Sequence, residues 1–467
     1  MSGITVSANA GSPGGAALDD AKSFMEHSMA KARLDTTDFL CQLYGCLTPE
    51  MFGAKGDGIK DDTQALREAL YQSDMQSKIL YFPSGKKYKV SGTLNFHGGK
   101  YMNYTLNMIG SIPAKKGDYA LSEYGGIQLM EGVSLFKNAK ITGSIKSMSF
   151  TGKRVDNVVL FDNCQCSGLV LAQNNISNFG VVFYDTSVST LSLITANIFL
   201  TVYYFSKNVN TSAGFTDSTI SYNYINGGIE KKDNSCFEWS YYNGALLTNN
   251  FIDYYRTIYY PVAKTKQAFV GPVSSNNHYQ VFRYLYAAGP NINTVTFCSY
   301  GDAFNWNDPS SENVNFIPMT YKGKDGNTYE IPPYVAICHS AWSTEIRNAK
   351  IERVMGPLVF VDGSLTEYEA NVFNVDFFGN NPYKEGQINH KKGSVNPYFN
   401  NGKYRFNKMC VKGVIEKVES LPQFSELWSS RVSGERVLYN GVIYEATNVQ
   451  KDGKWIASWS KVETINQ

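Results

Sequence analysis

The sequence predicts an all-β protein whose short strands stack as the coils of one long solenoid. Three observations lead to this prediction: apolar strand segments recur at a fixed period, asparagines recur with the same period, and the chain is rich in aromatic and poor in charged residues. A repeat in the low twenties of residues is typical of stacked units, because each unit buries its strands only against its neighbours. We therefore expect one long domain.

The period is visible in two stretches. Residues 158–162 (VVLFD) recur 23 positions later at 181–185 (VVFYD). Residues 249–256 (NNFIDYYR) recur 27 positions later at 276–283 (NNHYQVFR). At a coil spacing of about 4.8 Å, we expect about twelve coils between residues 90 and 410.

Asparagines lie at the turns of this repeat. Asn174 recurs as Asn197 at the shorter offset, and Asn223 precedes Asn250 by the longer one. Asparagine tolerates the left-handed backbone of a turn, and its side chain can bond to its counterpart in the next coil. We expect such bonds from coil to coil.

The composition excludes several classes of protein. The 467 residues include 43 Lys and Arg against 41 Asp and Glu, so no nucleic-acid partner is expected. A chain that is 43% hydrophobic is neither disordered nor collagen-like. It has no long apolar run, so we expect no membrane insertion. Aromatics make up 14% of the residues, including 32 tyrosines, and this surplus requires an explanation.

Cysteines and histidines show no metal-binding pattern. Cys41 and Cys46 lack a second Cys or His pair nearby, and the five histidines have no metal spacing. We expect free thiols, no metal and no cofactor. Free thiols suit a reducing compartment, and residues 1–15 lack the pattern of a signal peptide, so we expect synthesis in a cytoplasm.

Residues 1–45 are predicted to form a separate segment. Residues 16–33 predict a helix, with Asp19 and Asp20 in its first turn and one apolar stripe. A single helix cannot bury this stripe alone. The helix either folds back on the body, or it joins copies of itself or a larger particle.

The clearest local motif is residues 52–66 (FGAKGDGIKDDTQAL). Its glycines permit a tight turn with positive φ, and Asp61 or Asp62 can cap a helix. Leu66 and Leu70 give that helix an apolar face. Residues 79–85 (ILYFPSG) then predict a strand ended by a Pro/Gly turn.

This stretch resembles the N-terminal motif of the pectate-lyase superfamily of right-handed parallel β-helices: a glycine turn, a double aspartate with threonine, a capping helix and a strand with Pro-x-Gly. Residues 47–51 (LTPEM) resemble the form found in bacteriophage tailspikes. The resemblance implies a right-handed single-stranded parallel β-helix, capped by residues 46–90 and with residues 91–415 as its body. It also implies a homotrimer, and attachment of residues 1–45 to a phage tail or another tail protein.

Residues 416–467 predict a small C-terminal β module. Residues 437–444 predict a hairpin around Asn440-Gly441, a strong signal for a two-residue turn. With the tryptophans at 428, 455 and 459, the stretch loosely resembles small carbohydrate-binding modules of the chitin-binding type. The alternative is a cap or trimer-locking element whose aromatics form its own core.

Carboxylates on mid-body strands are the candidates for catalysis, because glycoside hydrolysis needs an acid and a base or nucleophile. Stacked on adjacent coils they would lie roughly 5 Å apart and suit a retaining enzyme, and two coils apart about 9.5 Å would suit an inverting one. The candidate catalytic residues are Glu238, Asp253 and Asp302.

Each candidate acid has its own argument. The repeat places Asp253 in an outward column with Asn226 and Gln280. Glu238 lies in an apolar and aromatic strand, where its pKa is expected to rise as a general acid requires. Asp302 is flanked in the sequence by Tyr300, Phe304 and Trp306. The alternative for each of them is a solvated surface residue.

The same coils supply candidate substrate-binding residues. Arg256 and Arg283 form a second column that can grip a carboxylate or phosphate. The aromatic candidates are Tyr254, Tyr255, Trp239 and Trp306. We expect the aromatics between residues 241 and 286 mostly to line a sugar groove rather than to fill a core.

These patterns and the resemblance predict a phage tailspike, located in the virion tail, that binds and depolymerises a bacterial surface polysaccharide by acid/base glycoside hydrolysis. The alternatives are a non-enzymatic receptor-binding fibre, a polysaccharide lyase, which Arg256 and Arg283 leave open but no calcium-binding cluster supports, and a free bacterial pectinase-like enzyme.

Overall fold

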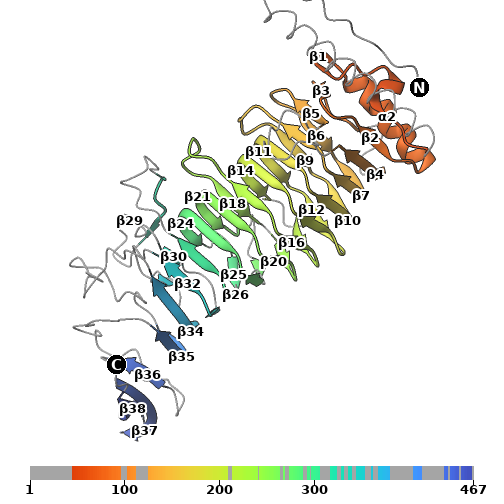
Figure 1. Ribbon diagram of the computed structural model, residues 1–467. Helices are drawn as coiled ribbons and strands as arrows, with labels where there is room; N and C mark the ends of the chain where they lie inside the picture. Colours follow the sequence, from red (N-terminus) through yellow and green to blue (C-terminus); the bar gives the residue numbers. More distant parts are fainter. Residues whose placement is uncertain are drawn as a thin grey trace, which may run out of the picture.

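The computed structural model describes residues 45–95, 102–111, 125–208, 213–239 and 241–262, and shorter stretches between 267 and 464. Its strands stack along one axis as a parallel β-helix, with a helix at the N-terminal end (Figure 1). The predicted all-β, right-handed parallel β-helix is confirmed.

A capping unit closes the N-terminal end of the β-helix. Its elements are η1 (Pro49–Phe52), β1 (Asp57–Asp61), α2 (Thr63–Gln76), β2 (Leu80–Phe82) and β3 (Lys87–Val90). The two aspartates of the motif accept hydrogen bonds from different backbone groups at the start of α2. Asp61 Oδ1 accepts the Thr63 amide at 3.0 Å, whereas Asp62 accepts the amides of Lys55 at 2.7 Å and Gly56 at 3.0 Å. Asp62 is the N-cap residue by position, but its side chain stabilises the glycine turn, whereas the Asp61 side chain accepts the first amide of the helix.

Three groups of parallel strands form the body. The first group pairs from coil to coil in this order: β4 (Met102–Gly110), β7 (Ala139–Lys146), β10 (Gln165–Ala172), β13 (Leu193–Thr195), β16 (Thr219–Ser221), β20 (Leu246–Thr248), β23 (Val273–Ser275), β26 (Thr296–Tyr300), β31 (Ser343–Arg347), β34 (Glu367–Phe378) and β35 (Lys403–Lys412). The start of β10 also pairs with a short branch: β12 (Ser187–Ser189), β15 (Gly214–Thr216) and β19 (Tyr241–Asn243).

The second group follows the first group along each coil. Its members are β5 (Gly126–Leu129), β8 (Ser149–Thr151), β11 (Asn175–Tyr184), β14 (Ile198–Lys207), β17 (Tyr224–Asn226), β21 (Phe251–Tyr259), β24 (His278–Tyr286), β27 (Ala303–Asn305) and β32 (Lys350–Glu352). The long strands β11, β14, β21 and β24 each bend at a residue with left-handed backbone: Asn178, Thr201, Tyr254 and Val281. Beyond the bend, each of these strands continues into the third group.

The third group pairs with those continuations and completes each coil. Its own strands are β6 (Ser134–Lys137), β9 (Val159–Asp162), β18 (Ser235–Glu238), β30 (Val335–Cys338) and β33 (Val359–Phe360). Two further pairs lie outside the three groups: β22 (Gln267–Ala268) with β25 (Ile292–Thr294), and β28 (Thr320–Lys322) with β29 (Thr328–Glu330).

The C-terminal strands form a separate antiparallel sheet of β36 (Arg436–Tyr439), β37 (Val442–Lys451) and β38 (Lys454–Thr464). The hairpin predicted around residues 440–441 is present, because Tyr439 pairs with Val442. The predicted helix at 16–33 lies outside the described residues, and the division into four domains stays a prediction.

The expected asparagine bonds run through five successive coils. Each amide oxygen accepts the backbone N–H of the asparagine one coil earlier, at 2.9 Å for Asn174 to Asn197, 3.0 Å for Asn197 to Asn223, 3.1 Å for Asn223 to Asn250 and 2.9 Å for Asn250 to Asn277. All five side chains are buried. The ladder therefore satisfies backbone groups at the turn between the first and second strand groups.

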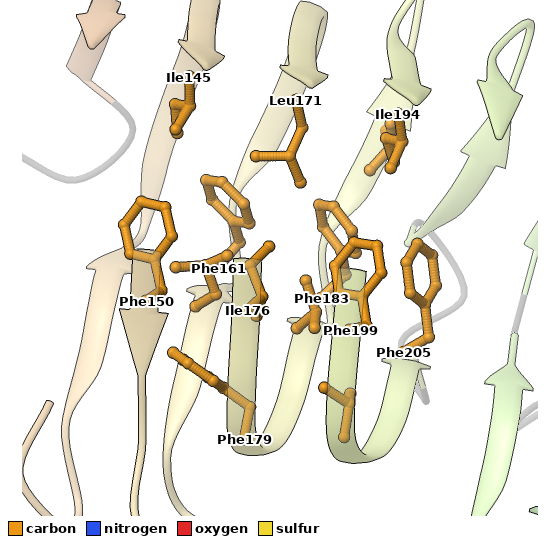
Figure 2. Close-up of a cluster of buried hydrophobic side chains, with 14 of the residues drawn as sticks. Ile145, Phe150, Phe161, Leu171, Ile176, Phe179, Phe183, Ile194, Phe199 and Phe205 are labelled. Carbon is orange, nitrogen blue, oxygen red and sulfur yellow. The ribbon is translucent and has the colours of Figure 1, made fainter. Parts of the chain in front are cut away.

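Aromatic rings stack inside the solenoid at the coil spacing. The rings of Phe161 and Phe183 lie 5.2 Å apart and nearly parallel, and Phe183 lies 5.4 Å from Phe205. Figure 2 shows these rings beside Ile145, Leu171 and Ile194 of the first strand group. The predicted repeat at 158–162 and 181–185 is this stack, since Phe161 pairs with Phe183 in register.

Candidate functional site

The predicted outward column around Asp253 is present on the second strand group. Asn226 pairs with Asp253, and Asp253 pairs with Gln280. The neighbouring Ile225, Ile252 and Tyr279 are completely buried, so the column points away from the core, as the repeat indicated.

Asp253 is shielded although it lies on the outer side of its strand. Its side chain is 5% exposed; Oδ2 accepts a hydrogen bond from the Tyr224 hydroxyl at 3.2 Å, and Oδ1 has no partner among the described residues. Burial raises the pKa of Asp253 to about 7, although the hydrogen bond from Tyr224 opposes the shift. A carboxyl group with this pKa can donate a proton near neutral pH.

A half-buried row of rings runs beside Asp253. Tyr224 pairs with Phe251, and Phe251 pairs with His278. The Tyr224 and Phe251 rings lie 5.4 Å apart, and the Phe251 and His278 rings stack at 4.7 Å with 16° between their planes. Sequence reasoning missed this row, although His278 aligns with Phe251 in the same 27-residue repeat that placed Asp253.

Glu238 ends β18 within a second set of polar residues, on the third strand group. It is half-buried and pairs in register with Lys207 of the preceding coil. Burial raises its pKa, Lys207 and Arg256 lower it, and Asp233 and Asp185 raise it further. We name Glu238, Lys207, Arg256, Asp233 and Asp185 the charged cluster.

The neighbours of the charged cluster hold its members in place. The Lys207 ammonium lies 4.2 Å from the centre of the Tyr204 ring. The Arg256 amide donates to Asn234 Oδ1 at 2.9 Å, so the residue that follows Asp233 is tied to β21. Arg256 Nε is buried and has no hydrogen-bond partner among the described residues, and the Arg256 guanidinium lies 6.0 Å from the centre of the Tyr260 ring.

The loop at residues 227–234 contains Asp233 of the charged cluster, and ion pairs hold this loop in place. Lys231 bonds to Asp156 at 2.8 Å and lies 3.6 Å from Asp233. Glu230 bonds to Arg154 at 3.0 Å. These pairs hold the loop against residues some 75 positions earlier in the chain. Sequence reasoning missed Asp233, whose signal was the run of charged residues at 230–233 in a chain poor in charge.

Glu238 and Asp253 do not form a stacked pair. β18 pairs with β21 so that Phe237 lies beside Tyr259, which places Glu238 beside Tyr260. Asp253 lies seven positions before Tyr260, on the other side of the left-handed bend at Tyr254. The spacing argument for a retaining or inverting enzyme therefore does not apply to these two residues.

Asp302 lies in the interior. It takes the next place in the asparagine ladder, where its Oδ1 accepts the Asn277 amide at 2.7 Å. Its Oδ2 accepts the hydroxyls of Ser274 and Ser299, both at 2.6 Å, and the residue is completely buried. Burial raises its pKa to about 6. We therefore leave Asp302 out of the site.

The two predicted arginines are neighbours on β21 and β24, as expected, but they differ in their contacts. Arg283 donates from Nη1 to the Phe316 carbonyl at 3.1 Å and from Nε to the Tyr284 hydroxyl at 3.0 Å. It thus ties residues 316–319 to the β-helix, whereas Arg256 belongs to the charged cluster.

Two of the four predicted aromatic contacts with substrate, those of Trp239 and Tyr255, are wrong, because both side chains are buried. Trp239 is 1% exposed and its ring lies 4.8 Å from Phe237, while Tyr255 is completely buried and donates to the Val202 carbonyl at 2.7 Å. Tyr254 is half-buried and packs on Val281 and Phe316. Trp306 lies outside the described residues. The expectation of a tyrosine-lined groove is wrong for the described side chains, since these aromatics between residues 241 and 286 are buried: Tyr255, Tyr259, Tyr279, Phe282, Tyr284 and Tyr286.

The described residues contain no group of three or more His, Cys, Asp or Glu able to hold a metal ion. Among the helices in the described part of the chain, none combines the length and apolar character needed to cross a membrane.

The family model of rhamnogalacturonase A/epimerase, pectate lyase-like proteins matches residues 50–298, more than half of the chain. The chain belongs to this family. The match includes the cap, the asparagine ladder up to Asn277, and both sets of polar residues. The resemblance seen in residues 52–66 therefore extends through most of the β-helix of this pectate lyase-like protein.

Known proteins similar to this pectate lyase-like chain include a capsule K30/K69-specific depolymerase of Klebsiella phage K64-1, 29% identical over 151 residues. The aligned part is 31% of this chain and 18% of that protein, so the chain spans less than a fifth of its relative. Solved structures include the Agl-KA catalytic domain, at 16% identity and a TM-score of 0.40, covering 78% of this chain and 65% of that one. Another is the phiAB6 tailspike with oligosaccharides of Acinetobacter baumannii surface polysaccharide, at 15% identity and a TM-score of 0.32, covering 59% and 50%.

Proposed function

We propose that this chain is part of a phage tailspike that binds and cleaves a bacterial surface polysaccharide, with the charged cluster as its active site. The observation that carries the proposal is Glu238, a half-buried carboxyl with a raised pKa among other carboxylates and two cations on the outside of a pectate lyase-like β-helix. The similarity to a phage capsule depolymerase supports this substrate class.

Hydrolysis of a glycosidic bond needs one protonated and one ionised carboxyl group. In our proposal Glu238 is the general acid, because its surroundings favour the protonated form. Asp233 is the ionised partner: its side chain is 46% exposed and lies 3.6 Å from the Lys231 ammonium. Lys207 and Arg256 bind polar groups of the sugar. Asp253, whose pKa is about 7, is the competing candidate for the acid.

The first experiment measures reducing ends released from capsule, exopolysaccharide and O-antigen extracts of candidate hosts. Glu238→Gln is expected to lower the rate by about 10²- to 10⁴-fold, because a general acid contributes about that much. Glu131→Gln is the matched control, since Glu131 is exposed on the turn between β5 and β6 and is expected to leave the rate unchanged. The alkaline limb of the wild-type profile is expected above pH 4.5, the ordinary pKa of a glutamate.

Three outcomes would contradict parts of this proposal. If Glu238→Gln retains activity and Asp253→Asn loses it, the acid is Asp253. If the products absorb at 235 nm, the enzyme is a lyase, for which Lys207 and Arg256 would neutralise an acidic sugar. If the protein binds a host polysaccharide and releases no ends from it, the chain is a non-enzymatic receptor-binding fibre.

A further inference from the structure

Residues 316–319, which we call the strap, contact both β24 and the loop at residues 227–234. The amide of Ile317 donates to the carbonyl oxygen of Lys232 at 3.0 Å. Lys232 directly precedes Asp233 in the sequence. The strap therefore holds the loop next to Asp233, in addition to the ion pairs described above.

Two neighbouring residues of β24 fix the strap, one before and one after Ile317. Arg283 Nη1 donates to the Phe316 carbonyl at 3.1 Å, and the Met319 amide donates to the Tyr284 hydroxyl at 3.0 Å. Arg283 Nε donates to the same hydroxyl at 3.0 Å, so the guanidinium also orients the group that accepts the Met319 amide. The Arg283 side chain thus stabilises both ends of the strap.

The strap also packs against the bends of the long strands. The side chain of Phe316 is 7% exposed and lies in one apolar cluster with Val281 and Tyr254. Val281 and Tyr254 are the residues with left-handed backbone at the bends of β24 and β21. Buried packing and hydrogen bonds therefore fix the strap at the same level of the β-helix as the bend that separates Asp253 from Arg256.

We propose that Arg283 is a positioning residue of the charged cluster, because it holds Asp233 beside Glu238 through the strap and the loop. The inference rests on the proposed function, since it takes the charged cluster as the site of cleavage. It gives Arg283 a role other than the expected grip on substrate, because its Nε and Nη1 already donate to protein acceptors. Reacting groups must be held within about 0.5 Å of their productive positions, and contacts of this kind supply that support.

The negative charge of Asp233 makes its position measurable. Burial is the largest cause of the raised pKa of Glu238, and the charge of Asp233 raises this pKa further. If Asp233 moves away, the pKa of Glu238 falls, and the alkaline limb of the rate profile moves to lower pH. Loss of the positive charge of Arg283 acts in the opposite direction, because removal of a cation raises the pKa of a carboxyl group.

The other groups that act on Glu238 lie outside the loop and the strap. They are the charged Lys207, Arg256 and Asp185, and the phenols Tyr184 and Tyr204, whose pKa values are raised by burial. A shift of the alkaline limb to lower pH therefore reports displacement of Asp233.

The test measures kcat, KM and the pH profile of the full chain on the polysaccharide extract that the wild type cleaves. Arg283→Met is expected to lower kcat by about 10- to 100-fold with little change in KM, since a misplacement of about 1 Å costs up to that much. The alkaline limb is expected to move to lower pH. Tyr284→Phe leaves the charge unchanged and removes the acceptor of the Met319 amide, so it should cause the same changes to a smaller extent.

Two further variants complete the comparison. Arg283→Lys keeps the charge and one donor, so it should recover part of kcat relative to Arg283→Met. Arg67→Met is the matched control, since Arg67 Nε also donates to a backbone carbonyl, that of Thr93 in the N-terminal part of the chain, at 2.7 Å. This control is expected to leave both the rate and the pH profile unchanged.

Hydrogen exchange measured by mass spectrometry tests the strap without any substrate. In Arg283→Met and Tyr284→Phe, the amides of residues 317–319 and 227–234 are expected to exchange faster than in the wild type. The amides of the asparagine ladder should keep their protection. Far-UV circular dichroism establishes whether Arg283→Met is folded, and Tyr284→Phe and Arg283→Lys carry the test if it is not.

Three results would overturn the proposal. The first is unchanged exchange in residues 227–234. The second is a fall in kcat with an unmoved alkaline limb, which would give Arg283 a purely structural role. The third is a rise in KM at unchanged kcat, which would make Arg283 a substrate-binding residue as the sequence indicated. If the wild type cleaves no extract, the proposed function fails, and the exchange measurement alone decides whether the strap holds the loop.

Discussion

The core of the β-helix changes in character along its axis. Between Phe136 and Phe205 it is filled by stacked phenylalanines and aliphatic residues (Figure 2). Between Tyr259 and Asp302 it contains a hydrogen-bonded network. The Tyr279 hydroxyl lies 2.6 Å from the hydroxyls of both Tyr259 and Ser274, and Ser274 donates to Asp302. The two regions share one backbone architecture, so the fold requires buried volume but not a particular chemistry inside.

The difference also accounts for part of the tyrosine surplus. In the second region tyrosine rings fill the core as phenylalanine rings do in the first. The hydroxyls of Tyr259 and Tyr279 form hydrogen bonds inside the core. Such a network stabilises the fold only if its members stay satisfied, because an unpaired buried polar group is costly. The following predictions test this contrast, beginning with the largest expected effect.

The apolar region is expected to be the more sensitive to loss of volume. Phe183→Ala removes a ring that contacts Phe161 and Phe205, and it should lower the free energy of unfolding by about 3–5 kcal/mol. Chemical denaturation measures this loss, and Phe183→Leu, which removes less volume than Phe183→Ala, should lower the free energy of unfolding less. A loss below about 1 kcal/mol would show that the stack collapses around the gap.

The polar region is expected to depend on pH through Asp302. Its pKa rises from 3.8 to about 6 on folding, so its contribution to stability is complete below about pH 4 and is lost as pH rises through 6. The loss amounts to at most about 3 kcal/mol. The wild type should therefore lose stability from pH 4 to pH 7 relative to Asp302→Asn, so the unfolding free energy of the variant minus that of the wild type should increase over this range. A difference that is constant with pH would contradict the buried, proton-binding carboxyl.

The smallest effect is expected for a single hydroxyl of the network. Tyr279→Phe keeps the ring, which stacks 5.7 Å from Phe304, and removes the group that joins Tyr259 and Ser274. The free energy of unfolding should fall by about 1 kcal/mol. Tyr88→Phe in the cap is a comparison outside the network, since its hydroxyl bonds to Glu50. An unchanged stability for Tyr279→Phe would mean that the network adds nothing to packing.

Sequence repeats predicted register well and burial poorly. The 27-residue offset correctly aligned Asn226, Asp253 and Gln280, because paired coils repeat the same positions. The burial of Tyr255 was missed because the left-handed residue at Tyr254 interrupts the alternation of inward and outward side chains. The repeats do not reveal that Asp302 continues the asparagine ladder, because its offset of 25 residues from Asn277 matches neither the 23-residue nor the 27-residue repeat.

The candidate site shows a similar limit. Glu238 was predicted from its apolar strand, and its raised pKa agrees with that argument. Asp233 was not predicted, because its position depends on a loop that ion pairs fasten to Arg154 and Asp156, far away in the sequence. Ion pairs between residues about 75 positions apart depend on how the coils stack, and they leave no recognisable pattern in the local sequence.

The cap has a consequence for growth of the solenoid. A stack of parallel strands ends in unpaired backbone groups that can recruit another strand. The helix α2 lies at the N-terminal end, with Leu66 completely buried and Leu70 2% exposed, so that end is closed to further coils (Figure 1). The N-terminal end of the rod is therefore a defined beginning, at which the stack of coils cannot be lengthened.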